Sequence, residues 1–419
     1  MEKVALVLSG GGSKGAYEIG VYKALKQLRK QINITTGTSI GAINAIFVAQ
    51  NDLKGAVKLW KNISFSAIYS EEDYPNFENA KLSEIYANHV KYFINEGGMD
   101  VSKMDNLFNK AFKPSKFFNS NIEYGLVTYN LSKNKPILKT KKDLNKDNIR
   151  DYVLASATCY PAFKPRIINN ELFIDGGYYD NLPINLAISL GATEIIAVDL
   201  RAIGFKKDIT DKSVDVTYIA PRNKIASFLI FDKKKAKETM KFGYNDAMKT
   251  FGKLDGNKFT FKKRNLIKNY NKYNKDFEKK LREIFNKANN NILNNIFKTK
   301  IFEEILNQKT TYKNFNYIVE KAGKIFNFEE FNIYNIRNYN HGLVTALSNT
   351  NTIDINKIIS KVKEKKFNNL IDNRKIVKYF YEAIESKNEK QLLTLIPLFN
   401  DEFLVALYIY TIKNKRFLY

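Results

Sequence analysis

The sequence predicts an α/β domain with a mainly parallel sheet covered by helices on both faces, followed by an all-helical domain. Up to about residue 200, short apolar runs alternate with segments whose apolar residues recur at helical spacing, which is typical of a parallel sheet with helical connections. From about residue 255 onward, glycine and proline become rare and helical spacing dominates. We therefore expect a first domain over residues 1–252 and a second over residues 253–419.

The elements of the first domain follow one another along the chain. The expected strands are apolar runs bounded by turn residues, over residues 4–9, 32–36, 124–130, 136–140, 172–174 and 194–200. The expected helices have apolar residues at helical spacing, over residues 16–30, 40–50, 149–157, 182–190 and 227–250. Residues 51–118 are less regular, and we interpret them as an insertion or cap over the sheet.

The second domain is predicted from helical periodicity. Its apolar residues recur at helical intervals, for example Phe277, Leu281, Ile284, Phe285, Ile301 and Ile305. A further apolar run, Phe403–Ile412, is followed by basic residues and could contact a membrane, but we favour packing in the core of this domain. No chemistry is apparent in the second domain.

The formal net charge of +25 is concentrated in the second half of the chain. Residues 1–205 carry 25 basic and 20 acidic side chains, whereas residues 206–419 carry 43 and 23. Such a basic half can attract an anionic membrane surface, although solvated lysine-rich helices would give the same count. Nucleic acid is not favoured, because no helix-turn-helix, finger or stacking motif accompanies the charge.

The sequence also limits the cellular compartments in which the protein is expected. A single cysteine, Cys159, cannot form an internal disulfide. The N-terminus enters a strand at once without a secretory signal, and no run of about 18 apolar residues predicts a transmembrane helix. The sequence therefore predicts a cytoplasmic or peripheral membrane protein; it does not exclude export without a leader, and it does not predict an oligomeric state.

A Gly-x-Ser-x-Gly motif, Gly37-Thr38-Ser39-Ile40-Gly41, lies where a strand should pass into a helix. A serine on so sharp a turn has its hydroxyl exposed above the sheet. The two glycines leave room for the turn and for close packing of the helix on the strand. Because this geometry suits a nucleophile, Ser39 is the candidate.

A second glycine-rich turn, residues 10–15, joins the first strand to the first helix. Amides at a helix N-terminus attract negative charge, and glycines let an anion approach the backbone. The turn also matches the dinucleotide-binding pattern, but the acidic residue expected about 20 positions later is missing. The turn is therefore a candidate oxyanion hole, formed by Gly10, Gly11, Gly12, Lys14 and Gly15.

A nucleophilic serine needs a base, and a carboxylate held against the hydroxyl can serve. Asp175 ends a predicted strand and precedes Gly176 and Gly177, so we expect it at the carboxyl edge of the sheet, the same edge as Ser39. Two rival carboxylates follow, with Asp180 interpreted as a helix cap and Asp199 as a structural residue at a strand end.

A histidine base is the alternative. Ser39, Asp175 and His341 have the chain order of an α/β-hydrolase triad. His341 lies in the basic helical part, and the other histidine, His89, lies on a probable helix of no recognised motif. A histidine in such a place is more often structural than catalytic, so the triad stays as a second hypothesis.

Taken in order, the three glycine-rich turns resemble those of the patatin-like phospholipases: residues 10–15, residues 37–41 and Asp175-Gly176-Gly177. Two further stretches agree, Ala155-Ser156-Ala157 with Pro161, Phe163 and Pro165, and Asp180-Asn181-Leu182-Pro183. The resemblance covers residues 3–203 well and residues 204–252 more loosely.

This resemblance implies a three-layer α/β/α fold and an acyl hydrolase with a Ser–Asp dyad. By it, Ser39 is the nucleophile, Asp175 is the base, and the amides of Gly11 and Gly12 form the oxyanion hole. Lys14 occupies the family's basic position, where it either meets an anion or braces the loop. The implied substrate is a phospholipid or another fatty-acyl ester, with no metal or cofactor. A non-catalytic membrane-binding protein remains the other class of function.

Overall fold

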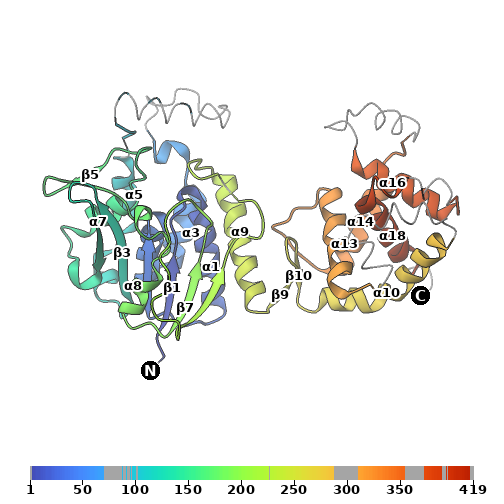
Figure 1. Cartoon of the computed structure of the whole chain (residues 1–419), viewed down its shortest axis with the longest axis horizontal. Coiled ribbons are helices and arrows are strands. Elements are labelled where there is room, and N and C mark those ends of the chain that lie inside the picture. The colour runs from blue at the N-terminus through green and yellow to red at the C-terminus, as the bar shows by residue number, and fades with distance from the viewer. Residues whose placement is uncertain are drawn as a thin grey trace. The chain divides into compact units, whose positions relative to one another are not determined.

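The computed structural model describes residues 2–69, 97–100, 102–225, 227–286, 310–353, 372–388 and 395–415, with a few single residues between them. The chain divides into two compact units, Met1–Thr250 and Phe251–Tyr419, which are described one at a time (Figure 1).

The first unit is built on an eight-stranded sheet with the order β5-β6-β3-β2-β1-β7-β8, in which β4 also pairs with β3. Neighbours from β3 through β2, β1 and β7 to β8 are parallel, whereas β4, β5 and β6 pair antiparallel. The strands are β1 Val4–Leu8, β2 Ile34–Thr38, β3 Glu123–Asn130, β4 Lys135–Thr140, β5 Arg166–Ile168, β6 Glu171–Asp175, β7 Glu194–Val198 and β8 Asp215–Ile219.

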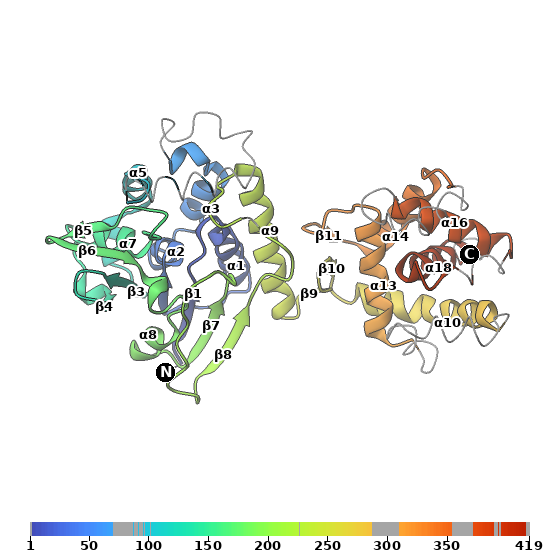
Figure 2. The same ribbon diagram turned by 45° about the horizontal axis from the view of Figure 1, so that its top comes forward.

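Helices cover both faces of this sheet, as Figure 2 shows. On one face, Ala5 and Val7 of β1 form an apolar cluster with Ile184 and Ala187 of α8. The opposite face carries α1, α2, α3 and α9. These helices are α1 Ala16–Gln27, α2 Ile40–Ala49, α3 Leu53–Asn62, α8 Ile184–Ser189 and α9 Lys233–Thr250. The predicted three-layer arrangement with a mainly parallel sheet is therefore confirmed.

Helix α9 is held against α1 by a buried polar cluster. The Tyr17 hydroxyl donates to the Asp246 carboxylate at 2.9 Å, and Lys249 pairs with the same carboxylate at 2.9 Å. The prediction that this helix begins at residue 227 is wrong. The carbonyl oxygens of Ser227 and Phe228 accept hydrogen bonds from Ser13, so they serve the glycine-rich turn instead of a helix.

Two strands of this sheet, β5 and β8, were not expected from the sequence. Three shorter helices complete the unit: α5 Lys103–Ala111, α6 Pro114–Phe118 and α7 Ile149–Ser156. Within the predicted insertion at residues 51–118, α3 packs against α1 and α9, while most of residues 70–96 lie outside the described residues.

The arrangement around β3 decides where the predicted site residues lie. β4 pairs with residues 125–130 of β3 and so occupies one edge of that strand. β2 pairs with residues 123–127 and β6 with residues 128–130, so β2 and β6 share the other edge. Because β2 is parallel to β3 and β6 is antiparallel, the two strands run toward each other and their carboxyl ends meet.

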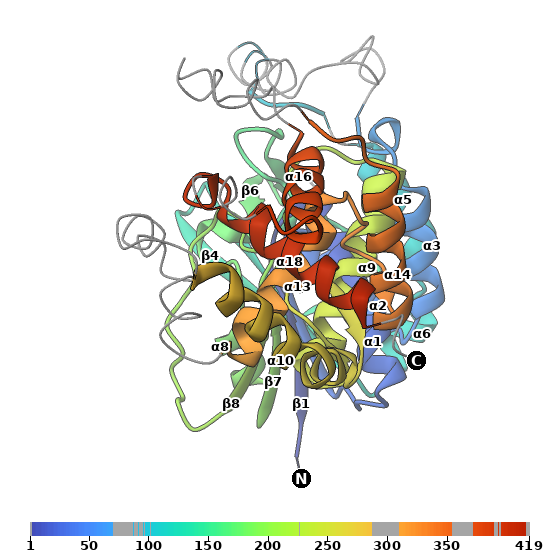
Figure 3. The same cartoon turned by 90° about the vertical axis from the view of Figure 1, so that its right-hand side faces the viewer.

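The second unit is mainly helical. Figure 3 shows α18 surrounded by the other helices of this unit, with which it packs. The helices are α10 Asn265–Phe285, α13 Tyr312–Ile325, α14 Ile336–Ser348, α16 Asn373–Glu385 and α18 Asn400–Asn414. The expectation of an all-helical domain is wrong in one respect, because β9 Leu254–Asp255, β10 Thr260–Lys262 and β11 Ile333–Tyr334 form a small sheet. Strands of two or three residues are too short to show an alternating pattern.

The core of the second unit contains the apolar residues that the sequence singled out. Phe277, Leu281, Ile284 and Phe285 are buried in one cluster with the run Phe403–Ile412. Packing of that run in the core, which the sequence favoured, is therefore confirmed. Ile301 and Ile305 lie outside the described residues. Within the described parts of the chain, no helix has the length and hydrophobicity needed to cross a bilayer.

Candidate active site

Ser39 lies on a sharp turn between β2 and α2. Its backbone angles, φ 57° and ψ −130°, are uncommon for a residue with a side chain and cost about 1–3 kcal/mol. A Cβ atom at Gly37 would lie 2.3 Å from the Gly41 oxygen, and one at Gly41 would lie 2.4 Å from the Leu8 oxygen. Only glycine fits at these two positions, which explains the spacing of the motif.

The turn is tied to β3 through Ser156, in α7. The Ser39 amide donates to Ser156 Oγ at 2.9 Å, and the Ser156 hydroxyl donates to the Val127 carbonyl at 2.6 Å. Ser156 is fully buried. The family resemblance includes this residue in the Ala-Ser-Ala stretch but assigns it no role; in the structure it fixes the backbone at Ser39.

Asp175 is the last residue of β6 and lies opposite Thr128 of β3. Its amide donates to the Thr158 oxygen at 2.8 Å, and its Oδ1 accepts from the Gly177 amide at 2.7 Å. A Cβ atom at Gly176 would lie 2.1 Å from the Val127 oxygen, so only glycine lets the chain turn this close to β3. The Asp-Gly-Gly motif therefore fixes the carboxylate at the end of the strand.

The Ser39 hydroxyl lies close enough to the Asp175 carboxylate to lower its pKa, and both side chains line one cavity. The sequence placed the two residues at one carboxyl edge of a parallel sheet, and this reasoning is wrong because β6 is antiparallel. They meet instead because β2 and β6 end opposite the adjacent residues Val127 and Thr128. Burial raises the pKa of Asp175 to about 6, while the Ser39 hydroxyl and a hydrogen bond from the Gly177 amide oppose the rise. Such a carboxylate is ionised at neutral pH and can accept the hydroxyl proton.

The glycine-rich turn borders the serine, since a Cβ atom at Gly10 would lie 3.0 Å from the Cβ atom of Ser39. The Gly10 amide donates to a backbone oxygen 3.1 Å away, and the Lys14 amide donates to the Gly11 oxygen at 3.2 Å. In the part of the chain that the structure describes, the amides of Gly11 and Gly12 have no hydrogen-bond acceptor. These two amides therefore stay candidates for the oxyanion hole, and Gly11 lines the same cavity as Ser39.

Gly15 ends the turn and packs against α2, where a Cβ atom would lie 2.7 Å from Ile40 Cγ1. The Asn44 amide group donates to the Gly15 oxygen at 3.0 Å and to Glu18 Oε2 at 2.8 Å, and its oxygen accepts from Trp60 Nε1 at 2.9 Å. Glu18 is fully buried, and burial raises its pKa well above the ordinary value. This cluster joins the helix that follows Ser39 to the turn that carries the candidate oxyanion-hole amides.

Sequence reasoning missed the Asn44 cluster. One signal was present, because Asn44 is the single polar side chain in the otherwise apolar run of residues 40–49. A buried polar residue in such a run needs partners, and it is a candidate for positioning neighbouring elements.

Ser39 and Asp175 line a cavity of about 530 Å³. Two cationic side chains, Lys14 and Arg201, also line it, and burial lowers the pKa of Lys14 while Asp199 opposes the change. The larger apolar or aromatic side chains of the wall are Tyr160, Pro161, Tyr178, Ile203, Phe205 and Phe228. The cavity therefore combines a hydroxyl and a carboxylate with apolar walls and positive charge.

Cys159 also lines this cavity and could be a rival nucleophile. Burial raises the pKa of its thiol to about 12, with a further contribution from Asp175. A neutral thiol is a poor nucleophile, so Cys159 does not compete with the serine.

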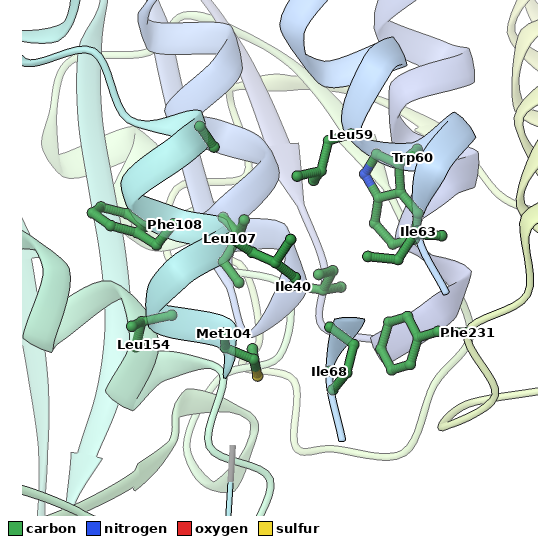
Figure 4. A pocket seen from close by; sticks show the side chains of 12 residues that line it. Ile40, Leu59, Trp60, Ile63, Ile68, Met104, Leu107, Phe108, Leu154 and Phe231 are labelled. Atoms are coloured by element: carbon green, nitrogen blue, oxygen red, sulfur yellow. The ribbon is translucent and has the colours of Figure 1, made fainter. Parts of the chain in front are cut away.

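A second cavity, about 40 Å³ in volume, begins at Ile40, the residue after Ser39 (Figure 4). Leu59 and Trp60 of α3 face Leu107 and Phe108 of α5 across it, and none of its lining residues is titratable. It supplies apolar surface but no reactive group.

The described residues of the first unit place no alternative base beside Ser39. No histidine occurs among the described residues of the first unit; His89 lies outside them, and His341 is exposed on α14 of the second unit. Asp199 pairs with Lys206 at 2.6 Å, in keeping with a structural role. Among the residues that the structure describes, no three possible metal ligands come together.

The interpretation of Asp180 as a helix cap is wrong. Its Oδ1 accepts from the Leu182 amide at 3.2 Å, whereas α8 begins at Ile184 after Pro183. The carboxylate closes a local turn, since an aspartate side chain can accept from the backbone two residues on. Burial raises the pKa of Asp180 to about 6.

Part of the first unit is similar in sequence to known proteins. A family model described as patatin-like phospholipase matches residues 6–188. Lysophospholipase nte1 of Aspergillus terreus is 29% identical over 215 residues, which are 48% of this chain and 12% of that protein. Patatin-like phospholipase domain-containing protein 6 of Homo sapiens is 27% identical over 220 residues, 50% of this chain and 14% of that protein. The chain thus spans a small part of the length of these relatives.

Among solved structures, VipD from Legionella pneumophila aligns with 99% of this chain and 90% of its own, with a TM-score of 0.35 and 16% identity. The match of residues 6–188 covers all three glycine-rich turns of the site. Residues 6–188 of the first unit therefore resemble a patatin-like phospholipase domain.

Proposed function

We propose that the protein hydrolyses fatty-acyl esters of phospholipids or lysophospholipids, with Ser39 as nucleophile and Asp175 as base. The observation that carries this proposal is the Ser39 hydroxyl beside the buried Asp175 carboxylate in one cavity, next to backbone amides that have no acceptor among the described residues. Relatives named lysophospholipase and patatin-like phospholipase support the choice of a lipid ester.

In the first half of the reaction, Ser39 Oγ attacks the ester carbonyl carbon while Asp175 takes the hydroxyl proton. The carbonyl oxygen becomes an oxyanion that accepts hydrogen bonds from the amides of Gly11 and Gly12. Loss of one such donor typically costs about 3–4 kcal/mol of transition-state stabilisation. When the C–O bond breaks, the leaving alcohol receives the proton from Asp175, and an acyl ester of Ser39 remains.

In the second half, water attacks the acyl ester. Asp175 accepts a proton from the water, and the same amides hold the new oxyanion. The Ser39 oxygen leaves with the proton from Asp175, which releases the fatty acid and restores the dyad. Every proton and bond is accounted for by the ester, one water molecule and these side chains, so the reaction needs no further reagent.

The second unit adds a separate hypothesis, contact of the basic residues 253–419 with an anionic membrane. The burial of Phe403–Ile412 removes the apolar part of that idea and leaves charge alone. The site gives no support for binding of nucleic acid or for formation of an oligomer.

The test is turnover of a mixture of phospholipids and lysophospholipids by the purified chain, with Ser39→Ala as the matched control. Mass spectrometry should show free fatty acid and deacylated lipid with the native chain and neither with the variant. An unchanged lipid mixture in both samples, or equal hydrolysis in both, would end the proposal. A lipid-binding protein without catalysis would give the first of these results.

A further inference from the structure

The rim of the catalytic cavity carries large apolar side chains that face solvent. Residues 201–205, the rim loop, follow β7 and line the cavity together with Ser39 and Asp175. Within the rim loop, Ile203 is 101% exposed and Phe205 is 67% exposed, and the neighbouring cavity residue Tyr178 is 43% exposed. Single exposed apolar side chains are common, but a group of them at the mouth of one cavity points to an interaction surface.

The backbone of the rim loop is fixed to the rest of the site. The Phe205 amide donates to the Gly177 oxygen at 2.9 Å, and the Phe205 oxygen accepts from the Asn181 amide at 2.6 Å. Gly204 has φ +148°, and a Cβ atom there would lie 2.8 Å from the Cβ atom of Asn181. The loop is therefore held by the segment that follows Asp175, and its apolar side chains are kept outward by the backbone.

Positive charge flanks these apolar side chains. Arg201 begins the rim loop, Lys206 and Lys207 follow it, and all three are exposed. Lys206 pairs with Asp199, and the Lys207 ammonium lies 4.3 Å from the centre of the Tyr179 ring. Apolar side chains between cations match the surface of a phospholipid bilayer, in which acyl chains lie beneath phosphate groups.

We propose that the rim loop and Tyr178 insert into the surface of a phospholipid bilayer, with Arg201 and Lys207 on the phosphates. The ester of a bilayer lipid would then pass into the cavity without crossing water. This inference rests on the proposed function, because the cavity behind the rim is the one that holds Ser39. It assigns the apolar membrane contact to the first unit, since the apolar run of the second unit is buried.

Binding is tested with the full chain carrying Ser39→Ala, so that no lipid is consumed. The test variant adds Ile203→Ser and Phe205→Ser, and the probes are vesicles of phosphatidylcholine alone or mixed with phosphatidylglycerol. Because each large apolar side chain contributes about 1.5–3 kcal/mol when buried, co-sedimentation should fall by about tenfold or more per side chain. Fold is checked by thermal unfolding, whose midpoint should not fall, because both side chains are exposed.

The matched control is Ile167→Ser together with Leu138→Ser, on β5 and β4. These side chains are 67% and 44% exposed but do not line the cavity, and their replacement should leave co-sedimentation unchanged. Equal losses in rim and control variants would overturn the proposal, because any exposed apolar side chain would then suffice. Unchanged binding of the rim variant would overturn it as well.

Measurements of turnover on two substrates distinguish this inference from the proposed function. With Ser39 intact, the ratio of turnover on vesicle phospholipid to turnover on a soluble short-chain ester should fall at least tenfold in the rim variant. A ratio equal to that of the native chain would overturn the inference and leave the proposed function standing. If the native chain hydrolyses neither substrate, the proposed function fails, and the co-sedimentation result still decides whether the rim binds membranes.

Discussion

Ser39 lies beside Asp175 because Ser39 follows β2 and Asp175 ends β6, two strands that run toward each other along one edge of β3. The pairing fixes their separation through backbone geometry and does not depend on flexible side chains. Glycine at position 176 lets β6 end close to β3, and Ser156 holds the backbone at the serine. The sheet therefore holds the two proposed catalytic side chains next to each other.

The identity of the base can be tested by one pair of substitutions. Asp175→Asn removes the proton acceptor but keeps the shape of the side chain. We expect ester turnover to fall at least about 10³-fold, which is the size of loss seen when a member of a serine hydrolase triad is removed. His341→Ala should leave turnover at the native level, because His341 is exposed on α14 of the second unit. The opposite pattern, with activity lost only in the histidine variant, would support the triad hypothesis.

The pH dependence of kcat/KM should report Asp175. Its pKa is raised to about 6, and the base must be ionised, so activity should rise with pH through about 6 with the slope of a single proton. Asp180 is a control, because burial raises its pKa to about 6 as well, although its carboxylate accepts from the backbone amides of Leu182 and Lys207 and not from Ser39. The acid limb should persist in Asp180→Asn. If that variant loses the limb, the pH profile reports the fold around Asp180 and not the dyad.

The same pKa shift predicts a change in stability. The folded-state pKa of Asp175, about 6, is above the ordinary value of 3.8, so its ionised form is disfavoured in the folded protein. The favourable contribution of the protonated form is complete below pH 3.8 and is lost as the pH rises through about 6. By linkage the difference approaches about 3 kcal/mol at high pH. Asp175→Asn should therefore gain unfolding free energy over the native chain at pH 8 but not at pH 4. A gain of the same size at both values would contradict the shift.

The Asn44 cluster should affect both stability and turnover. Asn44→Leu keeps the volume but removes the hydrogen bonds that Asn44 makes with Glu18 Oε2, Trp60 Nε1 and the Gly15 oxygen, and a buried group left unpaired costs about 1–3 kcal/mol. Because the cluster aligns the proposed oxyanion-hole amides with the nucleophile, kcat should fall while KM changes little.

Asn62→Leu, at the exposed end of α3, is the control for this substitution. It should have native kcat and native stability. If Asn44→Leu is less stable but keeps native kcat well below its unfolding temperature, the cluster supports the fold without positioning the site.

The burial of α18 predicts how the second unit responds to truncation of its core. Leu407 is fully buried, so Leu407→Ala should lower the free energy of unfolding by about 2–5 kcal/mol without changing vesicle binding. Leu398 is 48% exposed and supplies the control, Leu398→Ala, with little expected effect. A loss of vesicle binding at native stability in Leu407→Ala would mean that this helix leaves the core to meet lipid.

The local backbone of the candidate site was predictable because its motifs combine glycine with one polar residue. A Gly-x-Ser-x-Gly motif and an Asp-Gly-Gly motif require backbone conformations and close approaches that few other residues allow, so they single out Ser39 and Asp175 as candidates from the sequence alone. The alternation of strands and helices likewise predicts the parallel part of the sheet, in which β3, β2, β1 and β7 are neighbours.

The remaining features depend on contacts between distant segments. The antiparallel direction of β6 follows from its pairing with β3 and leaves no mark in the three apolar residues 172–174. The start of α9 was misplaced because residues 227 and 228 bind Ser13, far away in the sequence. Ser156 and Asn44 act through hydrogen bonds that a linear pattern does not show.

Covalent trapping of the nucleophile tests the central claim most directly. The full chain is treated with a fluorophosphonate and digested, and the modified peptide is identified by mass spectrometry. We predict one label per chain on Ser39, no label in Ser39→Ala, and labelling of Asp175→Asn slowed at least about 10³-fold because the hydroxyl has lost its base. A label on another residue, or labelling of Ser39 at the native rate in Asp175→Asn, would contradict the account.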